Sequence, residues 1–217
     1  METDLSSLKN YKGNSERKLR MRMFHEICHN ERVGASELCR LFEISPSRLS
    51  QNISAMLSIP YPVIKRTKQG HSVFYSVNAE NLIHQIDMIQ RMINALENDD
   101  SQAISDCFAF FSMVERSEKV SHMNRILSII AFEKQIMQSQ LVAKTGLSQS
   151  YVSNLILEEC ETGRVSKTKQ GRTVLYSINV EKSIEFFNDN LSYYKSLLEE
   201  NKKVQLHKGD VELTQSL

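Results

Sequence analysis

Two short stretches of the chain combine cationic and amide side chains and contain no acidic residue. Their candidate ligand-binding side chains are Lys65, Arg66, Lys68, Gln69 and His71 in the first stretch, and Lys167, Lys169, Gln170 and Arg172 in the second. Cations beside hydrogen-bonding groups suit phosphate oxygens, because each phosphate that they neutralise releases counterions from a nucleic acid. Both stretches are therefore predicted to contact a phosphate backbone.

A second set of polar side chains precedes each basic stretch, on the outward face of an expected helix. Its members are Ser47, Arg48, Ser50, Gln51 and Asn52 in the first case, and Gln149, Ser150, Tyr151, Ser153 and Asn154 in the second. Arginine pairs with guanine edges in DNA, and asparagine and glutamine pair with adenine edges. The same residue types are common on a solvated helix face, so this set alone leaves both interpretations open. The basic stretch that follows in both cases favours DNA binding.

These residues belong to an internal repeat. Residues 66–78 (RTKQGHSVFYSVN) and 167–179 (KTKQGRTVLYSIN) are identical at most of their positions. Upstream of them, 44–50 corresponds to 147–153 in the same order. Two matches in one order indicate that the chain contains two copies of one module.

Within each copy, the spacing of apolar residues predicts three helices followed by two strands. In the first copy, helices are expected over 16–29, 35–42 and 46–57. In the second copy, the second and third helices are expected over 138–145 and 149–160. Ser45 and Ser148 are suitable N-caps for the third helix. The alternation over 73–77 predicts a strand, and Gly70 suits the tight turn of a hairpin. The expected fold class is mainly α-helical with small β-hairpins.

This order of elements resembles a winged helix-turn-helix. The segment LVAKTGLSQSYVSNLI (141–156) is similar to the helix-turn-helix core of bacterial ArsR and MarR-type regulators, and ELCRLFEISPSRLSQNI (37–53) is a looser copy, with Glu43 where a turn glycine is usual. The resemblance implies that the third helix of each module enters the major groove and that the basic hairpin, or wing, meets the DNA backbone. Most such relatives carry one module per chain and form dimers.

The predicted organisation has two winged-helix domains in tandem, flanked by other segments. These are an N-terminal tail (1–14), winged-helix domain 1 (15–80), a helical connector (81–117), winged-helix domain 2 (118–180), a C-terminal helix (181–203) and a flexible tail (204–217).

Two amphipathic helices outside the modules carry narrow apolar seams. The seam residues are Leu82, Ile86, Ile89, Ile93 and Leu96 in the connector, and Ile184, Phe187, Leu191, Tyr194 and Leu198 in the C-terminal helix. Each seam could pack onto its own module, or the seams could pair within the chain or between chains. Because exposed apolar seams tend to mark interfaces, we expect a homodimer held by these helices.

Composition excludes several classes of protein. The 217 residues are 41% hydrophobic and 24% charged with a net charge of +1, which is unlike a disordered or histone-like chain. No apolar run suits a membrane span or a secretory signal, so we expect a cytoplasmic protein with no membrane partner. We find no Ser/His/Asp arrangement, phosphate loop or paired-carboxylate motif, so neither an enzyme nor a cofactor is expected.

A metal site is also not expected from the sequence. Cys28 lies near His25 and His29, but its place on the apolar face of the helix points it away from both histidines. Cys39 lacks the second nearby thiolate that a metal-binding box needs. Zinc requires three or four converging ligands, and the local sequence does not supply them.

The sequence therefore predicts a sequence-specific, double-stranded DNA-binding transcriptional regulator, and a repressor rather than an activator. One alternative is a plasmid or phage replication initiator or partition protein, because some initiators have two winged-helix domains. A second alternative is a winged-helix scaffold that binds other proteins and no DNA. The operator sequence and any small-molecule effector are not indicated.

Overall fold

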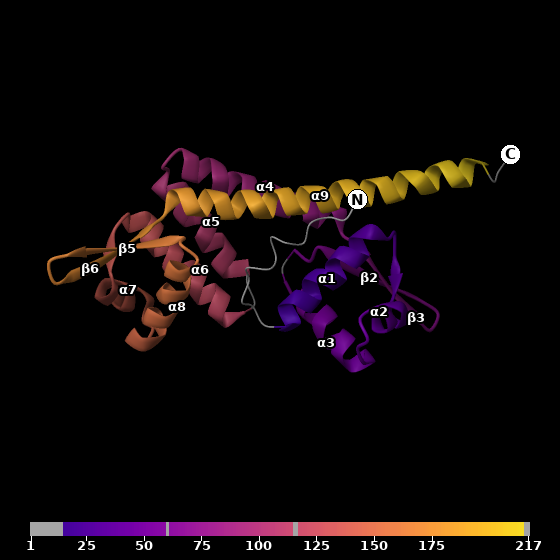
Figure 1. Cartoon of the computed structure of the whole chain (residues 1–217), viewed down its shortest axis with the longest axis horizontal. Helices are drawn as coiled ribbons and strands as arrows, with labels where there is room; N and C mark the ends of the chain where they lie inside the picture. The colour runs from indigo at the N-terminus through magenta and orange to yellow at the C-terminus, as the bar shows by residue number, and fades with distance from the viewer. Residues whose placement is uncertain (1–14, 60, 115–116, 215–217) are drawn as a thin grey trace. The chain divides into compact units, whose positions relative to one another are not determined.

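The structure is a computed structural model that describes residues 15–59, 61–114 and 117–214. These residues form two compact units. The first unit contains the described parts of 1–58, 62–79 and 197–217, and the second contains those of 59–61 and 80–196. Each unit is mainly α-helical and holds one antiparallel sheet of three strands (Figure 1). The coarse fold class agrees with the prediction, whereas the expected tail 1–14 lies outside the described residues.

The first unit contains the first copy of the repeat. Its elements are α1 (Ser15–His29), β1 (Val33–Gly34), α2 (Ala35–Leu41), α3 (Pro46–Leu57), β2 (Ile64–Gln69) and β3 (Ser72–Val77). The helices form because apolar residues recur once per turn, which places Met23 and Ile27 of α1 and Leu38 of α2 in the interior with no exposed surface. The C-terminal part of α9 (Val180–Thr214) belongs to the same unit.

The second unit contains the second copy and the connecting helices. Its elements are α4 (Ala79–Glu97), α5 (Ser101–Val114), α6 (Glu118–Glu133), β4 (Ile136–Met137), α7 (Gln138–Thr145), α8 (Gln149–Glu161), β5 (Val165–Gln170), β6 (Thr173–Ile178) and the first part of α9. From α6 to β6 the order of elements repeats the order from α1 to β3. The repeat seen in the sequence is therefore also a structural repeat.

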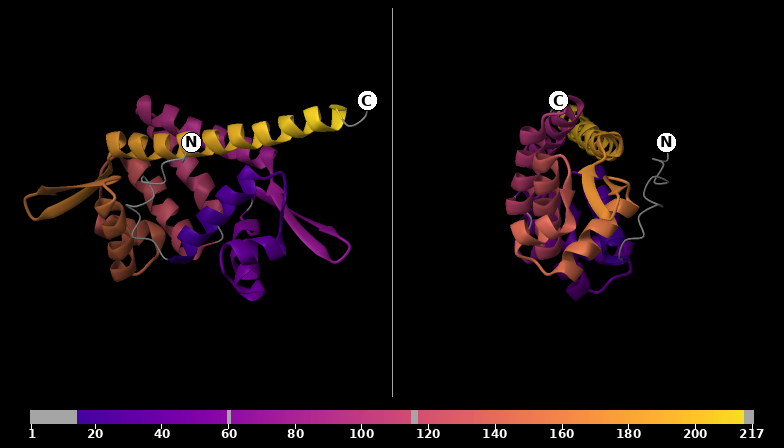
Figure 2. Two further views of the ribbon diagram at one scale, coloured as in Figure 1. Left: turned by 45° about the vertical axis from the view of Figure 1, so that its right-hand side comes forward. Right: turned by 90° about the vertical axis from the view of Figure 1, so that its left-hand side faces the viewer.

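Each sheet consists of a hairpin and one additional short strand. The strand orders are β1-β3-β2 and β4-β6-β5, with β1 and β4 only two residues long. In both hairpins the last pair of the ladder, Gln69 with Ser72 and Gln170 with Thr173, leaves a loop of two residues. The first loop residue has a positive φ, +59° at Gly70 and +61° at Gly171, as glycine provides in a type II′ turn. Figure 2 shows both hairpins extending from the helices of their own units.

The turns between α2 and α3 and between α7 and α8 have the local conformations that the sequence predicts. The Ser45 hydroxyl accepts a hydrogen bond from the Arg48 amide at 3.2 Å, and the Ser148 hydroxyl accepts one from the Tyr151 amide at 3.4 Å. Gly146 ends α7 with a φ of +70°, and Glu43 takes a φ of +51° at the corresponding position of the first copy. Glu43 therefore adopts a left-handed backbone that residues with a side chain adopt at a cost.

The expectation that the apolar seams are exposed is wrong. Leu82, Ile89, Ile93, Leu96, Phe187 and Leu191 are buried within the chain, and Ile86, Ile184 and Tyr194 are partly buried against the core of the second unit, while Leu198 is half-buried. Helices α4, α5 and α9 share this core with α6 and α8. Packing within the chain accounts for this burial, because most of the seam residues belong to or pack against the core of the second repeat.

The C-terminal helix is longer than predicted. Helix α9 continues to Thr214 and so includes most of the segment 204–217 that we expected to be a mobile tail. Among the helices in the described part of the chain, none combines the length and apolar composition needed to cross a bilayer.

Candidate functional site

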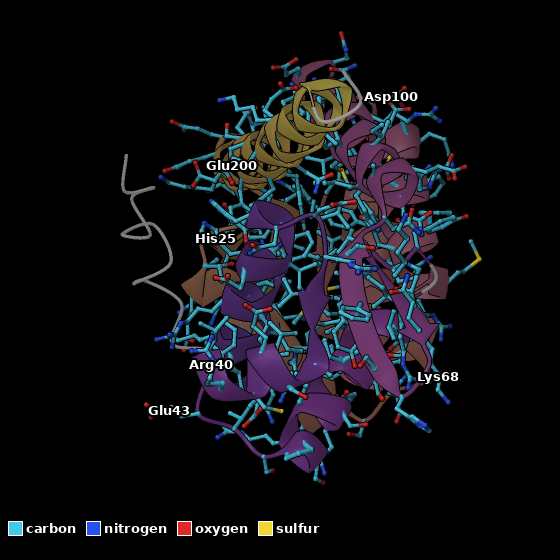
Figure 3. The ribbon with its side chains drawn as sticks, turned by 90° about the vertical axis from the view of Figure 1, so that its right-hand side faces the viewer. His25, Arg40, Glu43, Lys68, Asp100 and Glu200 are labelled. Carbon is cyan, nitrogen blue, oxygen red and sulfur yellow. The ribbon has the colours of Figure 1, made fainter. Side chains whose placement is uncertain are left out.

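The basic side chains of both hairpins lie on the surface. Those of Lys65, Arg66, Lys68, Gln69 and His71 are all exposed in the first hairpin, as are those of Lys167, Lys169, Gln170 and Arg172 in the second. Figure 3 shows Lys68 at the outer edge of the β2–β3 hairpin. Since residues 64–77 and 165–178 contain no acid, the cations of each hairpin face solvent without a local counter-charge from their own strands.

The first hairpin gains a further cation from outside the repeat motif. The Arg32 guanidinium lies 4.4 Å from the centre of the Phe74 ring, and its Nη1 donates a 2.9 Å hydrogen bond to Gln69 Oε1. Arg32 stands in the loop between α1 and β1, far from the hairpin in the sequence. No local sequence pattern marks Arg32, because only the fold brings this loop against β3.

On the first candidate recognition helix, α3, the structure separates the predicted residues into two groups. Ser47, Ser50 and Gln51 are exposed. Arg48 is also at the surface, but its side chain forms an ion pair with Glu16 of α1, at 2.6 Å between Nη2 and Oε1. Three residues of the predicted face are thus exposed, while the side chain of the fourth, Arg48, is paired with the carboxylate of Glu16.

Asn52 does not lie on the outward face of α3, where the sequence predicted it. Its side chain is only 3% exposed, and its Nδ2 donates to Glu16 Oε2 at 2.8 Å and to the Arg48 carbonyl at 3.0 Å. Arg20 Nη1 completes the arrangement with a 3.5 Å hydrogen bond to Asn52 Oδ1. Asn52 therefore positions α3 against α1, because a buried amide must satisfy its hydrogen bonds within the protein.

Glu16 is the functional candidate that the sequence analysis did not identify. The hydrogen bonds from Asn52 and from Arg48 lower the pKa of the Glu16 carboxyl below its ordinary value. The group is therefore an anion at neutral pH, at the surface where α3 presents its one arginine. A lone glutamate at the start of a helix carries no sequence signal for this contact, since acids are common in first turns.

On the second candidate recognition helix, α8, four of the five predicted side chains are free to meet a partner. Gln149, Ser150, Ser153 and Asn154 are exposed. Tyr151 is half-buried, with its ring edge-on to His122 of α6 at 5.8 Å between centroids. We therefore assign Tyr151 to the packing of α8 on α6 and leave the other four as the candidate reading face.

Cys28 is fully buried, and burial raises the pKa of its thiol to about 12. A thiol in this state does not supply a thiolate ligand at neutral pH. The two neighbouring histidines, by contrast, meet Glu200 of α9 within the first unit.

No protein-family model and no curated protein matches the chain. Among solved structures, the DIP2311 protein from Corynebacterium diphtheriae is similar at 12% identity and a TM-score of 0.26, over 75% of this chain and 26% of that one. This chain thus spans about a quarter of that protein.

Proposed function

We propose that the chain is a sequence-specific, double-stranded DNA-binding regulator of transcription, made of two winged helix-turn-helix modules in tandem. In this proposal, α3 and α8 enter major grooves, and the β2–β3 and β5–β6 hairpins contact phosphates. A regulator that binds over a promoter excludes the polymerase, so repression by occlusion is the simplest consequence of binding.

One observation carries the proposal. The same succession of three helices and a hairpin occurs twice, and both hairpins end in exposed lysines with no acid on either strand. Solvation alone gives no reason for the same arrangement in both copies. Binding to a phosphate backbone gives one, because each cation adds binding free energy through counterion release.

The exposed polar residues support reading of two different half-sites. Helix α3 offers Ser47, Arg48 and Gln51, whereas α8 offers Gln149 and Asn154 at its surface. Arginine favours guanine and amides favour adenine, so the two helices would prefer different bases. One chain is therefore expected to bind an asymmetric sequence.

The salt dependence of DNA binding tests the proposal. Bound duplexes are first selected from genomic fragments, and affinities for a selected and a random duplex are then measured by fluorescence anisotropy over a range of salt concentrations. Replacing Lys68 and Lys169 together with glutamine should weaken both affinities. It should also reduce the slope of log K against log salt by about 1.8, since each phosphate contact contributes about 0.9.

Lys195 and Lys203, both exposed on α9, provide the matched control. Their double replacement with glutamine removes the same charge and should leave the slope unchanged. Equal slopes for the two double variants would remove the hairpins from DNA binding. Failure to select any duplex would contradict the proposal as a whole and favour a protein-binding scaffold.

A further inference from the structure

Two histidines and a glutamate meet in the first unit, away from both candidate DNA-binding elements of that unit. His25 and His29 are one turn apart on α1, and Glu200 belongs to the C-terminal part of α9. One ligand atom from each residue lies within 4.8 Å of the other two. Figure 3 shows His25 and Glu200 on neighbouring faces of the two helices.

A hydrogen bond at one ring nitrogen of His29, Nδ1, leaves the other nitrogen, Nε2, available to bind a ligand. Nδ1 lies 2.9 Å from the carbonyl oxygen of His25, and because a carbonyl only accepts, Nδ1 carries the proton and donates. The neutral ring therefore presents a lone pair at Nε2. Histidines that bind metals usually donate their other ring N–H to a carboxylate, a backbone carbonyl or water, and this contact sets the tautomer and the ring orientation.

The other two ligand atoms are buried and make no hydrogen bond. His25 Nε2 has no hydrogen-bond partner among the described residues. Glu200 Oε2 lies 3.2 Å from His29 Nε2, but with the ring proton at Nδ1 this nitrogen has no hydrogen to donate to it. Buried polar atoms without partners are rare, because their desolvation is not compensated, and a bound ion is one of the few explanations.

We propose that His25, His29 and Glu200 form a binding site for a divalent transition-metal ion of the zinc type. Two imidazole nitrogens and one carboxylate oxygen are an established ligand set for Zn²⁺, and they leave a fourth position open. Ligand atoms about 2.1 Å from a tetrahedral ion are about 3.4 Å apart. His29 Nε2 and Glu200 Oε2 are 3.2 Å apart, close to that distance, and the ligand atom of His25 lies within 4.8 Å of both.

The bound ion would join α1 to the C-terminal part of α9. Residue Glu200 lies on the turn of α9 next to Leu197 and Asn201, which are 1% and 3% exposed. This part of α9 is thus already packed in the first unit, and the metal would add a cross-link at the edge of that contact. The site is independent of the proposed DNA binding, since none of its three ligands belongs to α3 or to a hairpin.

Titration of Zn²⁺ into the metal-free full-length chain tests the site by calorimetry. We expect one ion per chain, and at least a tenfold loss of affinity in each of the variants His25→Gln, His29→Gln and Glu200→Gln. His71→Gln, which removes an exposed histidine on the first hairpin, is the matched control and should keep the wild-type affinity. Affinities within twofold of wild type in all three site variants would overturn the proposal.

Two further measurements distinguish loss of the metal site from misfolding of the variant and from metal binding to cysteine. His29 is 37% exposed, so His29→Gln should keep the metal-free urea midpoint of the wild type; Zn²⁺ should raise that midpoint in the wild type and not in the variant. Co²⁺ in place of Zn²⁺ should show the visible bands of a tetrahedral ion. A cobalt–thiolate charge-transfer band would instead place the metal on cysteine and contradict the site.

Discussion

Arg48 of α3 donates two hydrogen bonds to one oxygen of Glu16, from Nη2 at 2.6 Å and from Nε at 3.0 Å. The other oxygen of the carboxylate accepts from the buried Asn52. Glu16 thus ties the first turn of α1 to α3 and at the same time neutralises an arginine on the proposed reading face. A DNA phosphate or a guanine must compete with this carboxylate for Arg48.

Replacing Glu16 with glutamine should strengthen binding of the selected duplex. The substitution keeps an oxygen that accepts from Asn52 but removes the anion that holds Arg48. Exposed ion pairs of this kind are weak, so we expect an increase in affinity of roughly two- to fivefold. Fluorescence anisotropy on the selected duplex measures it.

The effect of Glu16→Gln should depend on Arg48. In an Arg48→Ala background the substitution should change affinity much less, which a double-mutant cycle reveals. Glu26→Gln removes the same charge elsewhere on α1, where the carboxylate accepts from Asn30, and serves as the control. An equal gain in affinity from Glu26→Gln would mean that only the net charge matters.

The turns that follow α2 and α7 should respond in opposite directions to substitution. Glu43→Gly removes a side chain from a left-handed residue and should stabilise the protein by roughly 0.5–1 kcal/mol. Gly146→Ala places a side chain on the same conformation and should destabilise it by about 1–2 kcal/mol. A β-carbon at Gly146 would have no neighbour within 4 Å, so this loss reports on the backbone alone.

Urea unfolding of both variants at neutral pH provides these values. Destabilisation by Glu43→Gly would show that the glutamate side chain contributes more to the folded state than the strain that its backbone carries.

The ion pair between Arg164 and Glu159 should be essential to the second unit. Glu159 is 5% exposed, and Arg164 Nη2 lies 2.7 Å from Oε1 and 2.6 Å from Oε2. Arg164→Met leaves a buried carboxylate without its partner, so we expect a loss of about 3–5 kcal/mol at neutral pH. The double variant Glu159→Gln/Arg164→Met should recover part of it.

The loss in Arg164→Met should shrink as the pH falls. Burial raises the pKa of Glu159, and Arg164 opposes that rise, so the pKa increases further in the variant. An acid whose pKa is higher in the folded state binds its proton more tightly there, and lowering the pH through that pKa therefore stabilises the fold. Urea unfolding at pH 5 and at pH 7.5 measures the difference in stability between Arg164→Met and the wild type at each pH. A deficit independent of pH would assign the loss to the contact of Arg164 with Phe186.

Leu96→Ala should act on stability and not on assembly. Leu96 of α4 is 1% exposed in the core of the second unit, so its truncation should lower stability by about 2–5 kcal/mol. Ile83→Ala on the same helix removes a side chain that is 51% exposed and should change stability by less than about 0.5 kcal/mol. Chemical unfolding gives both values.

Light scattering measures the mass in solution and so tests whether these helices also join two chains in the predicted dimer. The homodimer stays a prediction, and a mass near the 25.0 kDa of one chain would contradict it. If Leu96→Ala remained folded and its mass fell below that of the wild type, the seam would act between chains and not within one.

The sequence by itself determined the features that depend on neighbours along the chain. The repeat, the bounds of α7, the serine caps at Ser45 and Ser148 and the hairpin glycines were predicted because periodicity, capping and turn conformation are local properties. The exposure of the hairpin lysines agrees with the charged and amide composition of these stretches, since every residue of β2 from Lys65 to Gln69 is exposed on both faces of the strand.

Only the tertiary structure decided which side chains meet across the chain. Asn52 shares the polar composition of its exposed neighbours, and its burial depends on how α1 crosses α3. The two-residue strands β1 and β4 are too short to show a period. Glu200 reaches the histidines of α1 because a helix that begins in one unit ends in the other. Contacts of this kind depend on packing free energy over the whole chain, which no local window of sequence contains.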